Sequence, residues 1–157
     1  MPPLFSTQTY SPDTSIGFLI KRAGQLMANN LDRALAEFDI THAQFGILLK
    51  VHHAGVKTAA DLAREVVADT GAMTRMLDRL EEKSFIVRSR SESDRRVIKV
   101  ALSDKGVQAA GRMTEVAVAA LNHHLRGFSA EEVDLFRSFL GRMIANACNQ
   151  PINSDNP

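Results

Sequence analysis

The chain has 157 residues, of which 45% are hydrophobic and 24% charged, and its formal net charge is +1. This composition excludes a wholly disordered chain and suffices for the core of one globular domain. No stretch approaches the roughly 20 apolar residues of a membrane span, and the N-terminus lacks the pattern of a secretory signal. We therefore expect a cytoplasmic protein without a membrane partner, and the single cysteine, Cys148, excludes an internal disulfide.

The N-terminal part predicts a flexible arm followed by a long helix. Residues 1–12 carry three prolines among Ser, Thr and Gln, which is typical of an arm. Apolar residues then recur at three- and four-residue steps across 13–38, which predicts one helix with a broad apolar stripe. The stripe consists of Ile16, Leu19, Ile20, Ala23, Leu26, Met27, Leu31, Ala34, Leu35 and Phe38.

Capping residues predict three shorter helices next. Thr41 and Gln44 form a capping box, in which each side chain satisfies the other's backbone N–H. Thr58 is expected to cap a second helix that ends before Asp69, and Asp69 or Thr70 is expected to cap a third. The apolar residues expected to face inward are Phe45, Leu48, Leu49, Val51, Met73, Met76, Leu77 and Leu80.

After Lys83 the period of the apolar residues changes from 3.6 to 2. The runs FIVRSR and RVIKVAL flank the polar SESD, which predicts a two-stranded hairpin. Ser103 is expected to cap a helix that ends near residue 125, and Ser129, boxed by Glu132, a last helix that ends near 148. Residues 149–157 predict a disordered tail.

A helix, a turn and a helix followed by a hairpin form a winged helix-turn-helix, whose second helix enters the DNA major groove. The outward face of that helix carries Gly71, Arg75, Asp78, Arg79 and Glu82, with Thr70 and Thr74 near its leading edge. Hydroxyl groups, a guanidinium that can bond guanine twice and a glycine that permits close approach suit base reading. The alternative is a solvated face on which the two arginines pair with the two acids.

Basic charge gathers in the predicted hairpin, or wing. From 83 to 99, six Lys or Arg stand against two acids, so this stretch carries +4. A narrow tip suits insertion of one arginine into the minor groove. Asp94 is expected to hold one neighbouring guanidinium in an ion pair and so stiffen the loop. The alternative is a charged turn that keeps an edge strand soluble. The candidate wing contacts are Arg90, Asp94, Arg95 and Arg96.

Four segments carry a family resemblance: THAQFGIL, TAADLAREV, DTGAMTRMLDRLEEKSFIVR and SESDRRVIKVALSDKG. Their order and spacing, from about residue 41 to 106, resemble the MarR family of bacterial transcription regulators. The expected fold is mainly α with a small β-hairpin, in which a DNA-binding lobe at 41–102 joins a helical dimerisation region at 13–38 and 104–148. One departure is Ser84, where the family usually has glycine, so a slightly different turn is expected there.

The resemblance implies a homodimer that binds a pseudo-palindromic operator in double-stranded DNA, with repression released by a small molecule. It implies Thr70, Thr74 and Arg75 in the major groove, Arg96 in the minor groove and Arg95 as a structural or phosphate partner. The apolar stripes independently favour an interface, because they exceed what a lobe of about 60 residues can cover.

Family members often respond to phenolic or aromatic carboxylate compounds. Arg22 could pair with such a carboxylate, with His42 and Phe45 nearby. The alternative for Arg22, which we favour, is a solvated or interface salt bridge.

No enzyme and no cofactor are expected, because the chain has neither a phosphate-binding glycine loop nor a nucleophile elbow. Its neighbouring histidine pairs point to different sides of a helix, so a metal site would need ligands from distant segments. Cys148 is expected to be a small core or interface residue. Two alternatives stay open: a metal- or redox-responsive regulator of this fold, and a winged-helix module whose basic hairpin binds an acidic protein.

Overall fold

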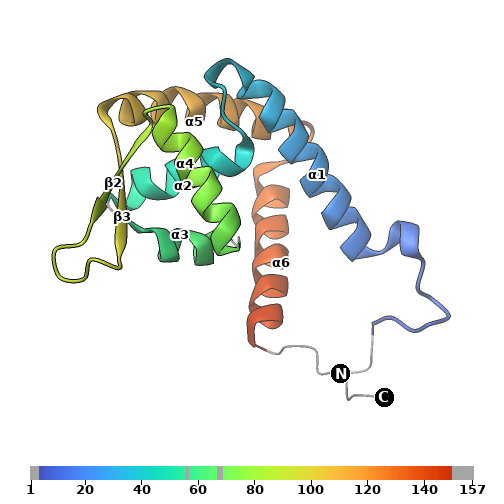
Figure 1. Ribbon diagram of the computed structural model, residues 1–157. Helices are drawn as coiled ribbons and strands as arrows, with labels where there is room; N and C mark the ends of the chain where they lie inside the picture. The colour runs from blue at the N-terminus through green and yellow to red at the C-terminus, as the bar shows by residue number, and fades with distance from the viewer. Residues whose placement is uncertain (1–3, 56, 67–68, 150–157) are drawn as a thin grey trace. The chain divides into compact units, whose positions relative to one another are not determined.

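The computed structural model describes residues 4–55, 57–66 and 69–149 (Figure 1). The chain divides into two compact units, Met1–Leu121 and Asn122–Pro157. The first unit contains most of the elements. Its elements are η1 (Pro12–Thr14), α1 (Ile16–Ala34), η2 (Ala36–Phe38), α2 (His42–Ala54), β1 (Lys57–Thr58), α3 (Ala59–Glu65), α4 (Thr70–Glu82), β2 (Ile86–Arg90), β3 (Ile98–Leu102) and most of α5 (Asp104–His124). The second unit contains α6 (Ala130–Asn149).

The predicted order of elements is confirmed, but the ends of the first helix differ. Ser15 caps α1 by accepting the N–H of Phe18 at 3.2 Å, so the helix starts later than predicted. The α-helix stops at Ala34 and a 3-10 turn follows, which ends at Asp39 with a φ of +54°. At the other end of the chain, Asn149 belongs to α6 and not to the predicted tail. Residues 1–3 of the predicted arm and 150–157 of the tail lie outside the described residues.

The capping predictions are confirmed. The Thr41–Gln44 box is complete, with N–H to oxygen distances of 3.3 and 3.1 Å. Thr58 caps α3, and Asp69 caps α4 by accepting the N–H of Ala72 at 2.8 Å. In the second unit, Ser129 and Glu132 form the second predicted capping box.

The predicted two-stranded hairpin belongs to a three-stranded antiparallel sheet of order β1-β3-β2. Lys57 and Val100 are partners on one side of β3, and Arg88 pairs with Val100 on the other. The predicted hairpin is confirmed as β2 and β3, and β1 is a third strand that the sequence did not predict. A strand of two residues between helices is too short to show a period of 2, so the sequence pattern carries no signal for β1.

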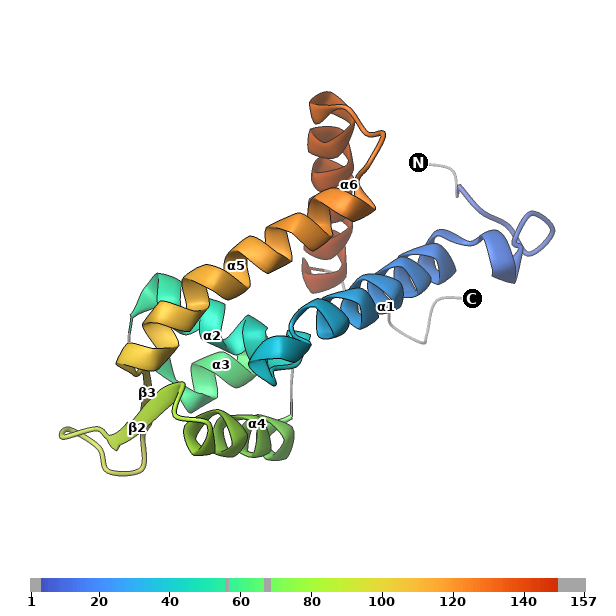
Figure 2. The ribbon, with the colours of Figure 1, turned by 90° about the horizontal axis from the view of Figure 1, so that it is seen from above.

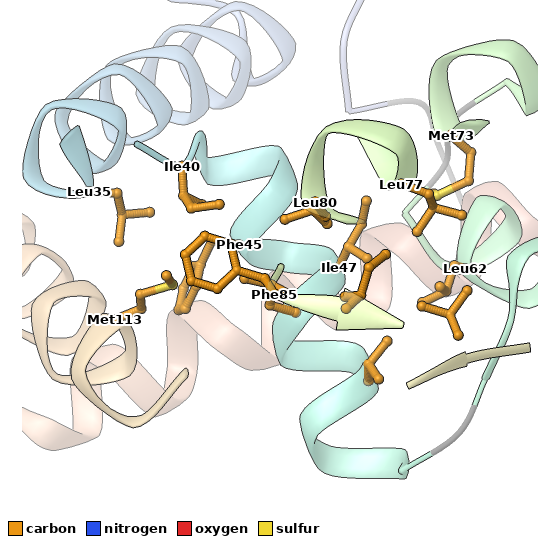
Figure 3. Close-up of a cluster of buried hydrophobic side chains, with 14 residues drawn as sticks. Leu35, Ile40, Phe45, Ile47, Leu62, Met73, Leu77, Leu80, Phe85 and Met113 are labelled. Carbon is orange, nitrogen blue, oxygen red and sulfur yellow. The ribbon is translucent and has the colours of Figure 1, made fainter. Parts of the chain in front are cut away.

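The core of the first unit lies between α2, α3, α4, the sheet and α5 (Figure 3). Its members include Phe45, Leu48, Val51, Met73, Leu77 and Leu80, as predicted, and also Leu35, Ile47, Leu62, Phe85 and Met113. Leu49 and Met76, predicted to face inward, are only partly buried and pack on its edge. The apolar stripe of α4 is thus buried in the core, and the opposite face of α4 is exposed to solvent.

A tight junction connects α4, β2 and α5. Ser84 has a φ of +61°, a left-handed conformation that glycine adopts at less cost than serine. The Ser103 hydroxyl donates to the Ser84 carbonyl at 2.6 Å, and the Ser103 N–H donates to the Phe85 carbonyl at 3.0 Å. In the view from above, α5 starts at the base of the hairpin (Figure 2).

Replacing Ser84 by glycine is expected to stabilise the chain by about 0.5–1 kcal/mol. Glycine removes the strain of the left-handed conformation, and this gain exceeds the cost of the greater conformational entropy of glycine in the unfolded chain. Urea unfolding at one protein concentration measures the difference. Ser89→Gly is the matched control, since Ser89 lies in the extended strand β2, and it should destabilise. An S84G variant no more stable than wild type would contradict the strain argument.

Within the described residues, no helix is long and apolar enough to cross a membrane.

Candidate DNA interface

The outward face of α4 carries all five residues predicted to contact the major groove. Thr70, Gly71, Thr74, Arg75 and Arg79 are each exposed, because Met73, Leu77 and Leu80 turn the opposite face into the core. The Asp69 cap fixes where the helix begins, and so which residues reach its leading edge.

Two local contacts shape the leading edge of α4. The Thr74 hydroxyl donates to the Thr70 carbonyl at 2.9 Å, so the side chain offers outward only oxygen lone pairs and a methyl group. A Cβ atom on Gly71 would lie 3.2 Å from Oδ1 of Asp69 and 3.5 Å from Nη1 of Arg75, so the guanidinium group lies near the glycine. A larger residue at 71 would first crowd the Asp69 carboxylate that caps α4.

The solvated-face alternative for α4 is wrong in its pairing. Asp78 pairs with Arg88 of β2, its Oδ1 lying 2.7 Å from Nη1. Within the described residues, neither Arg75 nor Arg79 has an ion pair. Their charges are therefore available to a partner.

Arg88 of β2 joins the wing to α4, the proposed recognition helix, through ion pairs that we call the clamp. The sequence did not predict this contact. The Nε atom of Arg88 donates to Oε2 of Glu81 at 2.8 Å, and its backbone N–H donates to Oε1 at 3.2 Å. The hydrogen bond from Arg88 lowers the pKa of Glu81, and the hydrogen bond to Glu81 raises the pKa of Arg88. Two acids one helical turn apart, at positions 78 and 81, indicate in the sequence that a basic partner could bind there. Only the fold shows that this partner is Arg88.

The clamp predicts a dependence of stability on pH. Because the folded-state pKa of Glu81 lies below its ordinary 4.5, the clamp stabilises fully above pH 4.5 and is lost as pH falls through the folded-state pKa. In thermal unfolding, Glu81→Gln should therefore lose less stability than wild type on acidification. Glu82→Gln, at an exposed neighbour, is the matched control and should follow wild type. Equal acid sensitivity of E81Q and wild type would contradict the clamp.

The wing tip is closed by backbone hydrogen bonds. The Asp94 carboxylate accepts the N–H of Arg96 at 2.9 Å, and the Asp94 carbonyl accepts that of Val97 at 2.9 Å. The Ser91 N–H donates to the Val97 carbonyl at 2.9 Å. The predicted ion pair between Asp94 and a neighbouring guanidinium is therefore wrong, because the carboxylate forms a turn with the backbone instead. Arg95 and Arg96 are both exposed.

A hollow of about 920 Å³ lies between α3, the start of α4 and the wing. Thr70, Thr74 and Arg96 line it, so the candidate wing arginine and two candidate major-groove residues border one hollow. Arg64 of α3 lines it as well and was not predicted. Arg79 lines a separate hollow of about 310 Å³. Arg90, at the end of β2, is exposed.

The three candidate effector residues do not come together in this chain. The His42 ring lies 3.0 Å from the Asp32 carboxylate, whereas Arg22 lies ten residues before Asp32 on α1, about 15 Å away along the helix axis. Phe45 is 3% exposed within the core. A ligand could touch Phe45 only by opening that core.

The described residues contain no group of three or more His, Cys, Asp or Glu side chains that could hold a metal ion. Cys148 is exposed in the single chain, not buried in its core.

Comparison with known proteins shows the family to which the chain belongs. The MarR family model matches residues 40–98. The multiple antibiotic resistance protein MarR of Escherichia coli is 30% identical over 130 residues, covering 82% of this chain and 90% of that protein. The chain belongs to the MarR family. The regulator YdcH of Bacillus subtilis is 34% identical over 99 residues, 60% of this chain and 67% of YdcH. As a MarR-family protein, the chain is a transcription regulator and not an enzyme.

Two solved structures share the fold of this chain. A cysteine-to-serine variant of Escherichia coli MarR, complexed with operator DNA, matches with a TM-score of 0.77 at 28% identity, covering 82% of this chain and 93% of the other. BpsR of Bordetella bronchiseptica matches with a TM-score of 0.79 at 21% identity, covering 86% and 96%. The second likeness concerns the fold alone.

Proposed function

We propose that the chain acts as a homodimer that binds a pseudo-palindromic operator and represses transcription until a small aromatic or phenolic effector releases it. The observation that carries the DNA-binding part is the exposed basic face formed by the recognition helix α4 and the wing. Phosphate neutralisation by Lys and Arg supplies most of the affinity for DNA. An exposed arginine without an acidic partner makes such a contact without first breaking an ion pair.

The residues of this face have different roles in the proposed complex. Thr70, Gly71, Thr74, Arg75 and Arg79 face the major groove. Arg96 enters the minor groove, Arg90 and Arg95 contact phosphates, and Asp94 holds the tip through its turn. The solved complex of Escherichia coli MarR with operator DNA supports DNA as the partner of this face.

Exposed apolar side chains support the homodimer. Large apolar residues that a single chain leaves exposed include Ile16, Leu19, Leu26, Val118, Leu121, Leu135, Phe136, Phe139 and Ile144. They lie on α1, α5 and α6, within the proposed dimerisation region of 13–38 and 104–148, and outside the proposed DNA-binding lobe of 41–102. Exposed apolar area of this extent is typical of an interface.

Two measurements test the proposal. Selection of bound DNA from a random pool should yield an inverted repeat, and sedimentation velocity should give a dimer. Leu26→Glu should dissociate the dimer and weaken binding to the selected DNA, because it places a charge in an apolar interface. Val87→Glu is the matched control at an equally exposed apolar residue of β2 and should stay dimeric. A monomeric wild-type chain, or a pool without sequence enrichment, would overturn the proposal.

The effector part is tested separately by screening aromatic acids and phenols for release of the selected DNA. Release by members of this class, and not by their uncharged aliphatic analogues, is the expected result. DNA affinity that no compound of this class changes would refute the ligand response and leave the DNA-binding part intact.

A further inference from the structure

Arg88 lies in the wing, but its charge is directed to the recognition helix and not to solvent. All three guanidinium nitrogens face carboxylates of α4. Nε and Nη2 contact Oε2 of Glu81, and Nη1 lies 2.7 Å from Oδ1 of Asp78. The side chain of Arg88 is only 27% exposed. With two acids and one arginine, the clamp carries a net charge of −1, so it does not attract phosphate groups.

The clamp is the second attachment between α4 and the wing. The first is the tight turn at Ser84, which leads from α4 into β2. Four residues later, the backbone N–H of Arg88 donates to Oε1 of Glu81 at 3.2 Å, so both oxygens of this carboxylate bond Arg88. Strand β2 lies at the edge of the sheet, where its outer N–H groups have no strand partner. Two separated attachments fix the direction of this strand, whereas a single one would allow it to pivot.

The wing tip amplifies any change in the direction of β2. Arg88 pairs with Val100 of β3, and Arg96 lies four residues before Val100, up to about 13 Å away along the strand. The loop of the wing projects away from the rest of the first unit (Figures 1 and 2). A binding contact must be held within about 0.5 Å of its productive geometry. A small rotation of β2 would therefore separate Arg96 from its proposed DNA contact while α4 stayed in place.

We propose that Arg88 is a positioning residue for operator recognition, which holds the wing at the angle from which Arg96 and α4 contact DNA together. This inference rests on the proposed DNA-binding function and adds to it a residue that does not touch DNA. It also gives Glu81 a role opposite to the one that its charge suggests. A carboxylate on the recognition helix repels phosphate groups, yet this one supports DNA binding through Arg88.

Glu81→Ala in the full-length chain is the sharpest test, because charge and position predict opposite results. Removing a negative charge from the DNA-binding face would by itself tighten binding. Loss of the clamp should instead weaken binding to the selected operator about tenfold, because the contact of Arg96 is partly lost, and should change binding to random DNA little. Glu82→Ala is the matched control, since Glu82 is exposed and lies outside the clamp. It should bind the operator at least as tightly as wild type.

A double-mutant cycle tests whether Arg88 acts through the wing tip. Arg88→Gln should weaken operator binding about as much as E81A does. Combined with Arg96→Ala, it should bind no more weakly than R96A alone, because a misplaced wing has no contact left to lose. Lys50→Gln is the matched control for R88Q, since it ends an ion pair with Glu65 elsewhere in the same lobe, and it should bind as wild type does. Urea unfolding of each variant verifies that it is folded.

A measurement without DNA tests the clamp itself. Backbone ¹⁵N relaxation of residues 91–97 should give lower order parameters in R88Q and E81A than in wild type and E82A, because the loop then moves more freely. Unchanged order parameters in both clamp variants would overturn the inference. Tighter operator binding by E81A, or additive losses in the R88Q and R96A cycle, would overturn it as well.

The two proposals fail differently. A wild-type chain that prefers no DNA sequence would overturn the proposed function. A preference for the operator that R88Q and E81A retain undiminished would overturn only the positioning role of Arg88.

Discussion

Arg96→Ala is expected to weaken binding to the selected operator by about ten- to a hundredfold, the loss of a contact worth about 1–3 kcal/mol. The guanidinium is exposed at the wing tip. The Asp94 carboxylate holds the turn by bonding the backbone N–H of Arg96 and not its guanidinium, so the charge of Arg96 stays available to DNA. Fluorescence anisotropy with labelled duplex, at one fixed salt concentration, measures the change, because affinities for DNA fall steeply with added salt.

Two variants serve as controls for R96A. Arg137→Ala removes an equal charge from α6 and should leave DNA affinity unchanged. Arg95→Ala should cost less than Arg96→Ala, and nearly equally for operator and random DNA, if Arg95 meets only phosphates. Operator affinity that survives R96A intact would remove the wing from the proposed interface.

Gly106→Ala is expected to destabilise the chain by about 3 kcal/mol, the upper part of the range for overpacking. A Cβ atom at 106 would lie 2.0 Å from the carbonyl oxygen of Phe85, which is backbone and cannot rotate away. That carbonyl also accepts the N–H of Ser103, so α5 and the end of the recognition helix would have to separate. Urea unfolding measures the loss, and DNA affinity should fall with it.

Gly46→Ala is the matched control for G106A. A Cβ atom at 46 meets nothing within 4 Å, so this substitution inside α2 should stabilise by about 0.5–1 kcal/mol. A G106A variant as stable as wild type would show that α5 can move from β2 at little cost, which contradicts the tight junction described here.

Local chemistry made much of the fold predictable. The capping boxes at Thr41 and Ser129, and the caps at Thr58 and Asp69, depend on residues three positions apart, so they can be recognised in sequence. The recognition helix followed because one apolar stripe fixes both its buried and its exposed face.

Two contacts that the sequence did not reveal join distant segments. The partner of Asp78 lies on a strand ten residues later, and the close approach that requires Gly106 comes from Phe85. Nothing near either residue in sequence announces these contacts. A local contact was also predicted wrongly. The Asp94 carboxylate could accept a hydrogen bond from a neighbouring guanidinium or from a backbone N–H, and in the tight turn it accepts the backbone N–H of Arg96.

The candidate sites divide in the same way. Residues on the outer face of α4 could be predicted because helix geometry alone exposes them. The grouping of Arg22, His42 and Phe45 assumed a spatial proximity that periodicity cannot establish, and Phe45 proved to be core.

The central claim is that two chains present two recognition helices and two wings to one two-fold DNA site. Hydroxyl-radical footprinting of the full-length protein on its selected duplex tests this most directly. The account predicts two chains per duplex and two symmetric protected segments, with centres about 10 base pairs, or a multiple of that, apart. A single protected segment bound by one chain, or the same protection on random DNA, would contradict it.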